Sequence, residues 1–404
     1  MKRTKILLSM MAVLTLMPSI KVAADDVVKV FSLEESGKLA AMLAEAGDDA
    51  DSVVVSGRMN ADDMSALKAY CANGHVHGID ISEVSFPGDS LPNIAFGYTG
   101  KDNPVENITL PKQMRVIGHY AFYNMGNLKH VEIPKTVETI DYFAFACCTS
   151  LRQVELPEGL KEMSSAIFSN SGLEELTIPA SVKEMSHSIC AGCLNLKQLT
   201  ILADVDEIRI DFASLCMNLE SLTLPDHIKK IESRAFSSTS LSTLTWPSAL
   251  ETIDDEAFSG CKFENIVLPS RVTAIEKGAF AYNEQLKTIT LPASLLTIEQ
   301  SALQGCTHLE SAVCESPVPP TTMGQEAAPQ AILYVPEVAV DAYRAAPWWK
   351  DFKEIRAYVP SGIDGIVDKN SGQHPLYSID GIKVSSTGHR GIMIRDGKKY
   401  TSRQ

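Results

Sequence analysis

Apolar residues recur in the same order every 22 or 23 positions over more than half of the chain. Each unit contains two alternating apolar residues just before a proline, as with Ile108 and Leu110 before Pro111. Further apolar residues stand three, six and eleven positions after the proline. The proline position recurs at Pro111, Pro134, Pro157, Pro179, Leu202, Pro225, Pro247, Pro269, Pro292 and Glu315. A fixed period of this length indicates a repeat solenoid rather than one globular core.

The pattern inside each repeat predicts its local structure. The alternating residues predict a short strand with one buried face, and the proline ends its pairing because it lacks an N–H donor. Three repeats lack one residue in the loop after the phenylalanine that recurs in most repeats, as between Phe168 and Leu173. One coil cannot bury its own apolar stripe, but stacked coils share a continuous core. We therefore expect an α/β repeat solenoid of the leucine-rich-repeat type over residues 105–315, a right-handed superhelix with a parallel β-sheet.

The segments on either side of the repeats predict end caps. Residues 25–104 include a helix that Asn60 could cap at its start, and residues 316–359 end in a cluster of Trp348, Trp349 and Phe352. Residues 360–404 predict a linker and a small β-rich tail. Its two Asp-Gly turns, at Asp380 and Asp396, favour two hairpins. The tail is a possible sorting or attachment module.

The first 24 residues have the pattern of a signal peptide. A basic start, with Lys2, Arg3 and Lys5, precedes an apolar run over residues 6–17 that is too short to span a bilayer. Small residues follow, and we expect cleavage near Ala24. This indicates a protein that is secreted or displayed on the outer cell surface, with no transmembrane helix in the mature chain.

The repeats from about Ile108 to Cys314, with the flanking segments, resemble the BspA-like leucine-rich-repeat surface proteins of Bacteroidetes and other anaerobes. The resemblance covers the IPxxVxxIxxxAFxxCxxLxxV repeat, the opening SGRMNADDMSALKAY and the closing LYVPEVAVDAYRAAPWWKDFKEI. It implies surface exposure and, for several family members, adhesion to host matrix proteins or to other bacteria. The tail resembles C-terminal modules of secreted Bacteroidetes proteins, some of which are sorting signals.

Charge and chemistry narrow the possible functions. The net charge of −14 argues against nucleic acid as a partner, because phosphate binding needs clustered cationic side chains. Most of the nine cysteines fall at inward positions, where a thiol behaves as a small hydrophobe, and the pair Cys190 and Cys193 lacks partners for a metal site. No catalytic motif stands out, so we expect no enzyme activity, no metal and no cofactor.

The exposed face of the predicted strands is the first candidate binding surface. Its columns are rich in threonine and contain an acidic group, and the candidate residues are Glu132, Glu155, Glu175, Thr177, Thr200, Thr223 and Thr245. Threonine also simply suits an exposed strand. The function expected is protein–protein interaction, with adhesion to an extracellular ligand of the host matrix or of a bacterial surface. The alternative is a glycan-binding accessory protein that uses Trp348 and Trp349, although the pattern favours an end cap that buries these rings.

Overall fold

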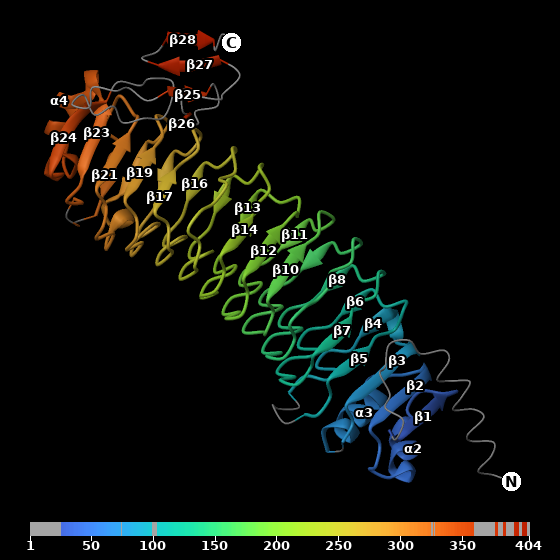
Figure 1. Cartoon of the computed structure of the whole chain (residues 1–404). Coiled ribbons are helices and arrows are strands. Elements are labelled where there is room, and N and C mark those ends of the chain that lie inside the picture. The colour runs from blue at the N-terminus through green and yellow to red at the C-terminus, as the bar shows by residue number, and fades with distance from the viewer. Residues whose placement is uncertain are drawn as a thin grey trace.

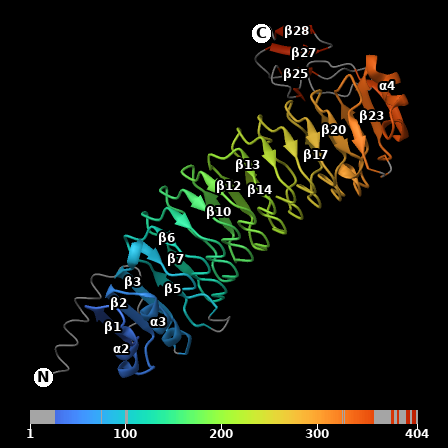
Figure 2. The same ribbon diagram turned by 180° about the vertical axis from the view of Figure 1, so that it is seen from behind.

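The protein is an elongated row of stacked coils with a cap at each end (Figures 1 and 2). In this computed structural model, the described residues are 26–73, 75–98, 103–324, 326, 328–358, 376–378, 383–384, 392–395 and 398–401. The predicted repeat solenoid is confirmed, since the coils follow one another along the chain and pair in parallel through their short strands.

Each regular coil contributes one strand to the front of the solenoid. Neighbouring front strands pair in register, so that Ile108 lies beside Val131 and Leu176 beside Leu199. These apolar side chains point inward and are buried, whereas the residues on either side of them face solvent. The front strands are β5 (Asn107–Thr109), β7 (His130–Glu132), β10 (Glu175–Ile178), β12 (Gln198–Ile201), β14 (Ser221–Thr223), β17 (Asn265–Val267), β19 (Thr288–Leu291) and β21 (Ser311–Cys314).

A second, shorter strand follows the proline of each coil and forms the back of the solenoid. Its inward residue is the apolar position six after the proline, for example Ile117 paired with Ile140. The back strands are β4 (Ser90–Leu91), preceded by η1 (Pro87–Asp89), then β6 (Val116–Ile117), β8 (Thr139–Ile140), β9 (Glu162–Met163), β11 (Glu184–Met185), β13 (Glu207–Ile208), β15 (Lys230–Ile231), β16 (Thr252–Ile253), β18 (Ala274–Ile275) and β20 (Thr297–Glu299), followed by η2 (Gln300–Leu303).

Two tight turns per coil form a third hydrogen-bonded column, here called the turn side. These bonds join neighbouring coils: Tyr120 N donates to Tyr142 O of the next coil at 3.1 Å, and Phe122 N donates to Ala144 O at 2.8 Å. Two residues four positions apart take left-handed backbone angles in most coils, such as Tyr120 (φ 56°) and Asn124 (φ 62°). A side chain in this conformation costs roughly 1–2 kcal/mol, so the bonds between coils must hold these turns.

The core consists of columns of identical side chains, one from each coil. The rings of Phe122, Phe145 and Phe168 stack with centroids 4.8 and 5.6 Å apart and are fully buried. The nine cysteines are free thiols, and most lie in this core. Cys148 Sγ donates to Phe122 O at 3.1 Å and Cys193 Sγ donates to Phe168 O at 3.0 Å.

The N-terminal cap extends the front sheet with longer strands and two helices. Strands β1 (Val28–Leu33), β2 (Ser52–Arg58) and β3 (Gly78–Ser85) pair in parallel and continue into β5. Helices α2 (Leu39–Ala46) and α3 (Ala61–Asn73) connect them. Asn60 caps α3 as predicted, because its Oδ1 accepts the N–H groups of Asp62 and Asp63 at 3.0 Å. The back strand β4 and its turns already form a coil inside the segment expected to be cap.

The C-terminal cap closes the other end with aromatic side chains. It comprises β22 (Thr321–Met323), β23 (Ile332–Pro336), η3 (Glu337–Ala339), α4 (Val340–Ala345), η4 (Trp349–Asp351) and β24 (Glu354–Tyr358). Tyr343 packs edge-on against Trp349, and Trp349 Nε1 donates to Pro320 O at 2.9 Å. These contacts cover the last coil, whose apolar face would otherwise meet water.

The tail forms a small antiparallel sheet in the order β26-β25-β27-β28. The two predicted hairpins are confirmed as β25 (Leu376–Ser378) with β26 (Lys383–Val384), and β27 (Ile392–Arg395) with β28 (Lys398–Thr401). The Asp-Gly turns themselves lie outside the described residues. Among the described helices, none combines the length and apolar character needed to cross a bilayer.

The prediction that every front segment would join one sheet is wrong at two coils. Residues 153–155 and 243–245 form no strand, and the front therefore divides into the sheets β1-β2-β3-β5-β7, β10-β12-β14 and β17-β19-β21-β23-β24. Each interrupted segment opens a coil with the shortened loop, from Phe168 to Leu173 or from Phe258 to Phe263. The shortened loop does not cause this by itself, because the third shortened coil, from Phe236 to Leu241, opens with the regular strand β14. The back is divided once, between β11 and β13, where Leu202 replaces the repeat proline.

Candidate binding site on the front face

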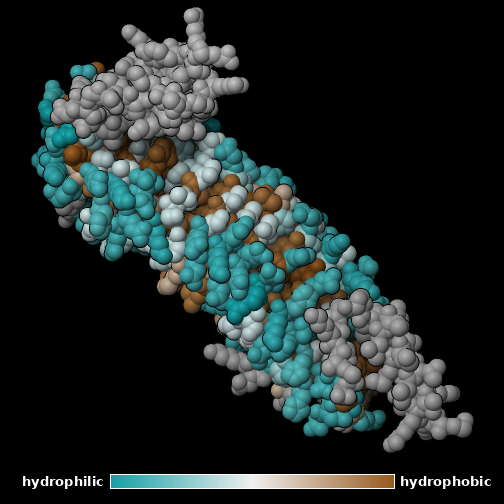
Figure 3. Space-filling model, in the orientation of Figure 1, coloured by the Kyte–Doolittle hydropathy of each residue, from teal (hydrophilic) through white to brown (hydrophobic). Residues whose placement is uncertain are grey.

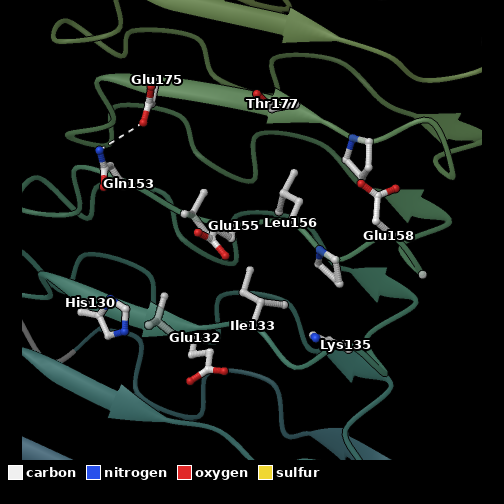
Figure 4. Close-up of a pocket in the computed structure, with 15 residues that line it drawn as sticks. His130, Glu132, Ile133, Lys135, Gln153, Glu155, Leu156, Glu158, Glu175 and Thr177 are labelled. Carbon is white, nitrogen blue, oxygen red and sulfur yellow. Dashed lines mark hydrogen bonds between the residues drawn. The ribbon is translucent and has the colours of Figure 1, made fainter. Parts of the chain in front are cut away.

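A pocket of about 810 Å³ lies at the first interruption of the front sheet, between β7 and β10 (Figure 4). Residues 152–156 run through it. Glu174 N donates to Arg152 O at 2.9 Å on the β10 side, but among the described residues no backbone hydrogen bond joins residues 152–156 to β7. The pocket is lined by His130, Val131, Glu132, Ile133, Lys135, Gln153, Val154, Glu155, Leu156, Pro157, Glu158, Gly159, Glu175, Thr177 and Pro179.

The opening exposes apolar surface that regular coils bury. Val154 and Leu156 are only partly buried, whereas Leu176 and Ile178, at the same positions in the next coil, are 2% and 0% exposed. On the face drawn in Figure 3, patches of hydrophobic surface lie among hydrophilic ones. The pocket therefore combines an apolar floor with a polar rim, as expected of a site for a partner side chain.

The rim of the pocket is strongly acidic. Glu132, Glu155, Glu158 and Glu175 are all exposed, and Lys135 is the one lysine or arginine among the lining residues. Gln153 Nε2 donates to Glu175 Oε1 at 3.1 Å, which orients that carboxylate (Figure 4). Within the described residues, none of the four carboxylates forms an ion pair.

Several carboxylates elsewhere on the solenoid pair with a lysine or arginine one coil away. Lys161 Nζ lies 2.9 Å from Glu138 Oε2, and Lys287 Nζ lies 2.8 Å from Glu264 Oε2. These lysines hold the pKa of each glutamate below its usual value, through a hydrogen bond and charge attraction. The rim of the front pocket lacks this compensation, so its negative potential is available to a ligand.

A second hollow, of about 640 Å³, lies on the back where β11 and β13 fail to pair. Its charges are partly compensated, since Lys183 Nζ lies 2.6 Å from Asp204 Oδ2 and Arg209 lies 2.7 Å from Glu207 Oε2. Both of these hollows thus occur where a ladder is interrupted, but the front one has four carboxylates without an ion pair in the described chain, whereas the back one combines two cations with its carboxylates. The front pocket is therefore the stronger candidate for a charged partner.

The structure brings together four of the residues named from the sequence. Glu132 ends β7, Glu155 lies in the interrupted segment, and Glu175 and Thr177 belong to β10. Thr200 and Thr223 lie farther along, in β12 and β14, and pair with Thr177 as a continuous threonine row. Thr245 is exposed in the second interrupted segment. None of these last three lines the pocket.

The two tryptophans of the alternative site are part of the C-terminal cap. Trp348 is 5% exposed and Trp349 is 1% exposed, and their rings pack edge-on at 4.9 Å. Neither ring presents a free face to solvent, because both fill the end of the core. A ligand that stacks on aromatic rings would need to displace the cap at this position.

The pocket also contains residues that sequence reasoning missed. Lys135 and Glu158 follow the strand positions and were not assigned to the exposed face, and Val154 and Leu156 were expected to be buried. One signal was present, since the loop deletion after Phe168 marks this coil as irregular. The deletion alone does not show that the adjacent strand opens.

The structure offers little for metal or redox chemistry. Among the residues that it describes, no group of three or more His, Cys, Asp or Glu side chains could hold a metal ion. Cys190 and Cys193 are buried in separate contacts, with Cys190 Sγ donating to Phe212 O at 3.5 Å. Burial raises the pKa of Cys193 to about 12, so this thiol is protonated near neutral pH.

The parallel coils, their 22- or 23-residue period and the exposed polar strand face define a leucine-rich-repeat solenoid, a class of protein that mediates protein interactions. More particularly, the chain belongs to the BspA type leucine rich repeat family: the family profile, with six copies of the repeat, matches residues 89–212 and 210–320. This match covers more than half of the chain and confirms the resemblance seen in the sequence.

Solved structures with a similar fold come from several bacteria. A leucine-rich repeat protein from Bacteroides ovatus is 23% identical, with a TM-score of 0.53, over 67% of this chain and 64% of that chain. A leucine rich cell surface protein from Faecalibacterium prausnitzii is 20% identical, with a TM-score of 0.38, over 67% and 84% of the two chains. The alignment therefore spans less than two thirds of the Bacteroides ovatus protein. None of the curated proteins compared with the chain matches it.

Proposed function

We propose that this chain is a secreted or surface-displayed adhesive protein without enzyme activity, whose front pocket binds a cationic segment of an extracellular protein. One observation carries the proposal. At the interrupted front sheet, four exposed carboxylates that form no ion pair within the described chain surround an apolar floor of Val154 and Leu156. Elsewhere on the solenoid, several carboxylates pair with a lysine from the next coil, as Glu106, Glu138 and Glu264 do.

The chemistry of the pocket favours a lysine or arginine flanked by apolar residues. The cationic head would meet the ring of carboxylates, and the aliphatic stem would lie along the apolar floor. Exposed charges attract a partner over distance but contribute modest affinity, so binding should weaken as salt rises. Several weak contacts along the sheet could together give firm adhesion. The signal-like first 24 residues and the module-like tail support export and display.

The test is surface plasmon resonance of the mature chain on immobilised host matrix proteins and mucins. A variant with Glu132→Gln, Glu155→Gln and Glu175→Gln should bind at least one of these ligands roughly tenfold more weakly, because it loses the charges that the proposal makes responsible. The control carries three equivalent changes at exposed glutamates outside the pocket and so has the same net charge: Glu220→Gln, Glu251→Gln and Glu310→Gln.

The control variant should bind as the wild type does. Equal loss in both variants would mean that overall charge, and not the pocket, determines binding. Unchanged affinity in the pocket variant, or no binding of the wild type to any of the proteins, would contradict the proposal. Binding to a defined glycan with no binding to any of the proteins would favour the alternative function.

A further inference from the structure

Six aromatic rings gather on the turn side of the first coils. They come from three neighbouring coils, and two turn positions carry a ring in successive coils: His119 with Tyr142, and Tyr120 with Phe143. We call this group the aromatic ladder, and it consists of Tyr98, His119, Tyr120, Tyr123, Tyr142 and Phe143. The ladder is not part of the core, because Tyr98 is 54% exposed and Tyr142 is 39% exposed. It also lies on a different side of the coil from the front pocket.

Rings at the same position in successive coils lie parallel. His119 and Tyr142 stack with centroids 4.8 Å apart and an interplanar angle of 3°, and Tyr120 and Phe143 stack at 5.1 Å and 1°. These distances are close to the strand spacing of about 4.8 Å, so the stacking follows from the repeat itself. Each ring of one coil thus covers part of a face of the ring before it.

The ladder ends abruptly at Tyr142 and Phe143. The corresponding residues of the next coil are Ser165 and Ala166, and backbone bonds hold them in place, with Phe143 N donating to Ser165 O at 3.0 Å. The coil after that supplies His187 and Ser188. No ring therefore continues the stack, and the last two rings form an aromatic step above small side chains.

The surface beyond the step is rich in hydroxyl groups and carries no formal charge. The three residues after back strand β9 are Ser164, Ser165 and Ala166. The three residues after β11, in the next coil, are Ser186, His187 and Ser188. The four serines are partly exposed. The back strands of the Tyr142 coil and of these two coils belong to one continuous ladder, β8-β9-β11, so the serine surface extends roughly 10 Å from the step.

The serine surface leads into the polar hollow on the back. Ser186 and His187 belong to the serine surface and also line the back hollow of about 640 Å³. Lys183, Asp204 and Arg209 line the same hollow. These last side chains are paired with one another or with neighbours, so together they offer both donors and acceptors at little net charge. The aromatic step, the hydroxyl surface and the hollow form one path across three coils.

We propose that this path binds a neutral glycan, with one pyranose ring stacked on the open face of Tyr142 and in contact with the edge of Phe143, whose ring is nearly perpendicular. A pyranose has an apolar C–H face and a rim of hydroxyl groups, which matches an aromatic face beside serine hydroxyls. A cation is a poorer fit, because the ladder rings pack against one another and leave no cage between them. The glycan would continue over the serines towards His187 and Arg209.

The experiment is electrophoresis of the mature chain in native gels that contain a neutral polysaccharide: a β-glucan, a galactomannan or a starch. At least one polysaccharide should retard the wild type. Tyr142→Ala should reduce the affinity roughly tenfold, the loss expected for an aromatic anchor. The matched control is Tyr282→Ala, which removes a tyrosine that is 55% exposed but stacks on no other ring in the described chain. This control should be retarded as the wild type is.

A second variant tests the stacking geometry directly. Ser165→Tyr extends the ladder by one ring and covers the open face of Tyr142, so it should abolish retardation although it adds an aromatic side chain. The unchanged melting temperature of each variant shows that it is folded. The proposal would be overturned if no polysaccharide retarded the wild type. It would also be overturned if Tyr142→Ala or Ser165→Tyr were retarded as strongly as the wild type. If Ser165→Tyr instead strengthens binding to deglycosylated mucin, the step is a protein contact and the glycan proposal fails.

Discussion

At the residue scale, one position in the turn of each coil shows why this chain has so many cysteines. The thiols of Cys148, Cys193 and Cys261 donate to the carbonyl of a core phenylalanine in the preceding coil, at 3.0 to 3.3 Å. Asn283 occupies the same position and donates to Phe258 O at 2.8 Å. The position needs a small side chain that also satisfies a buried acceptor, and cysteine meets both requirements.

The buried thiols should therefore be unreactive in the folded protein. Burial raises the pKa of Cys193 to about 12 and that of Cys261 to about 11, and the thiolate is the reactive form. Iodoacetamide at about pH 8 should label only Cys147, which is partly exposed. Mass spectrometry of the labelled peptides checks this, with all nine cysteines labelled after denaturation as the control. Rapid labelling of Cys193 in the native protein would contradict the assignment.

At the scale of elements, a coil is a unit that is stabilised mainly by its two neighbours. Phe258 is fully buried, and its ring stacks on Phe236 at 5.5 Å and on Phe280 at 5.9 Å. Backbone bonds on the turn side join the same coils, with Phe258 N donating to Ala279 O at 2.8 Å. Core contacts thus connect residues about one repeat apart, and few connect distant coils.

Phe258→Ala should lower the free energy of unfolding by about 3–5 kcal/mol, since it opens a cavity in a buried aromatic column. The loss should be local. Hydrogen exchange measured by mass spectrometry should show weaker protection in the coils on either side of residue 258, with unchanged protection around β5 and β7. Phe122→Ala is the matched variant, and it should give the reverse distribution. Uniform loss of protection along the chain in either variant would show that the solenoid unfolds as one unit.

At the scale of the whole molecule, ion pairs between neighbouring coils distribute charge over a chain with a net charge of −14. Most pairs join residues that are one repeat apart, such as Lys129 with Glu106 and Lys229 with Asp206. Such exposed pairs contribute little individually. They do restrict where uncompensated charge remains, and the front pocket is one such place.

Replacing Glu264 or Glu276 by glutamine should change the stability at neutral pH in opposite directions. Lys287 lowers the pKa of Glu264, so the stabilisation from this pair is present above about pH 4.5 and is lost as pH falls through the folded pKa. Burial and the nearby Asp255 and Asp254 raise the pKa of Glu276, so its ionised form destabilises the fold at neutral pH and its protonation relieves this as pH falls.

Glu264→Gln should therefore lower the melting temperature at pH 7, and Glu276→Gln should raise it. The expected gain for Glu276→Gln is roughly 0.5 kcal/mol, the size of a like-charge contact across strands. Both differences should shrink towards zero when melting is measured near pH 3 by circular dichroism. The same sign for both variants at pH 7 would contradict the assigned environments.

The sequence by itself determined the solenoid, its period, the inward positions and the placement of Glu132, Glu155 and Glu175 on one exposed face. It could do so because each coil repeats the same local pattern, and a position in the repeat corresponds to a position in space. The same reasoning located the Asn60 helix cap and the two tail hairpins, which depend on residues close in sequence.

Only the tertiary structure decided where the ladders between coils are broken and which rings meet. The front pocket forms because residues 152–156 fail to pair with β7, and the aromatic step forms because Ser165 follows Tyr142 in the stack. Both features depend on contacts between residues one repeat apart, where a local difference such as a small side chain changes the surface. The period of the sequence describes what the coils share, whereas binding sites arise where neighbouring coils differ.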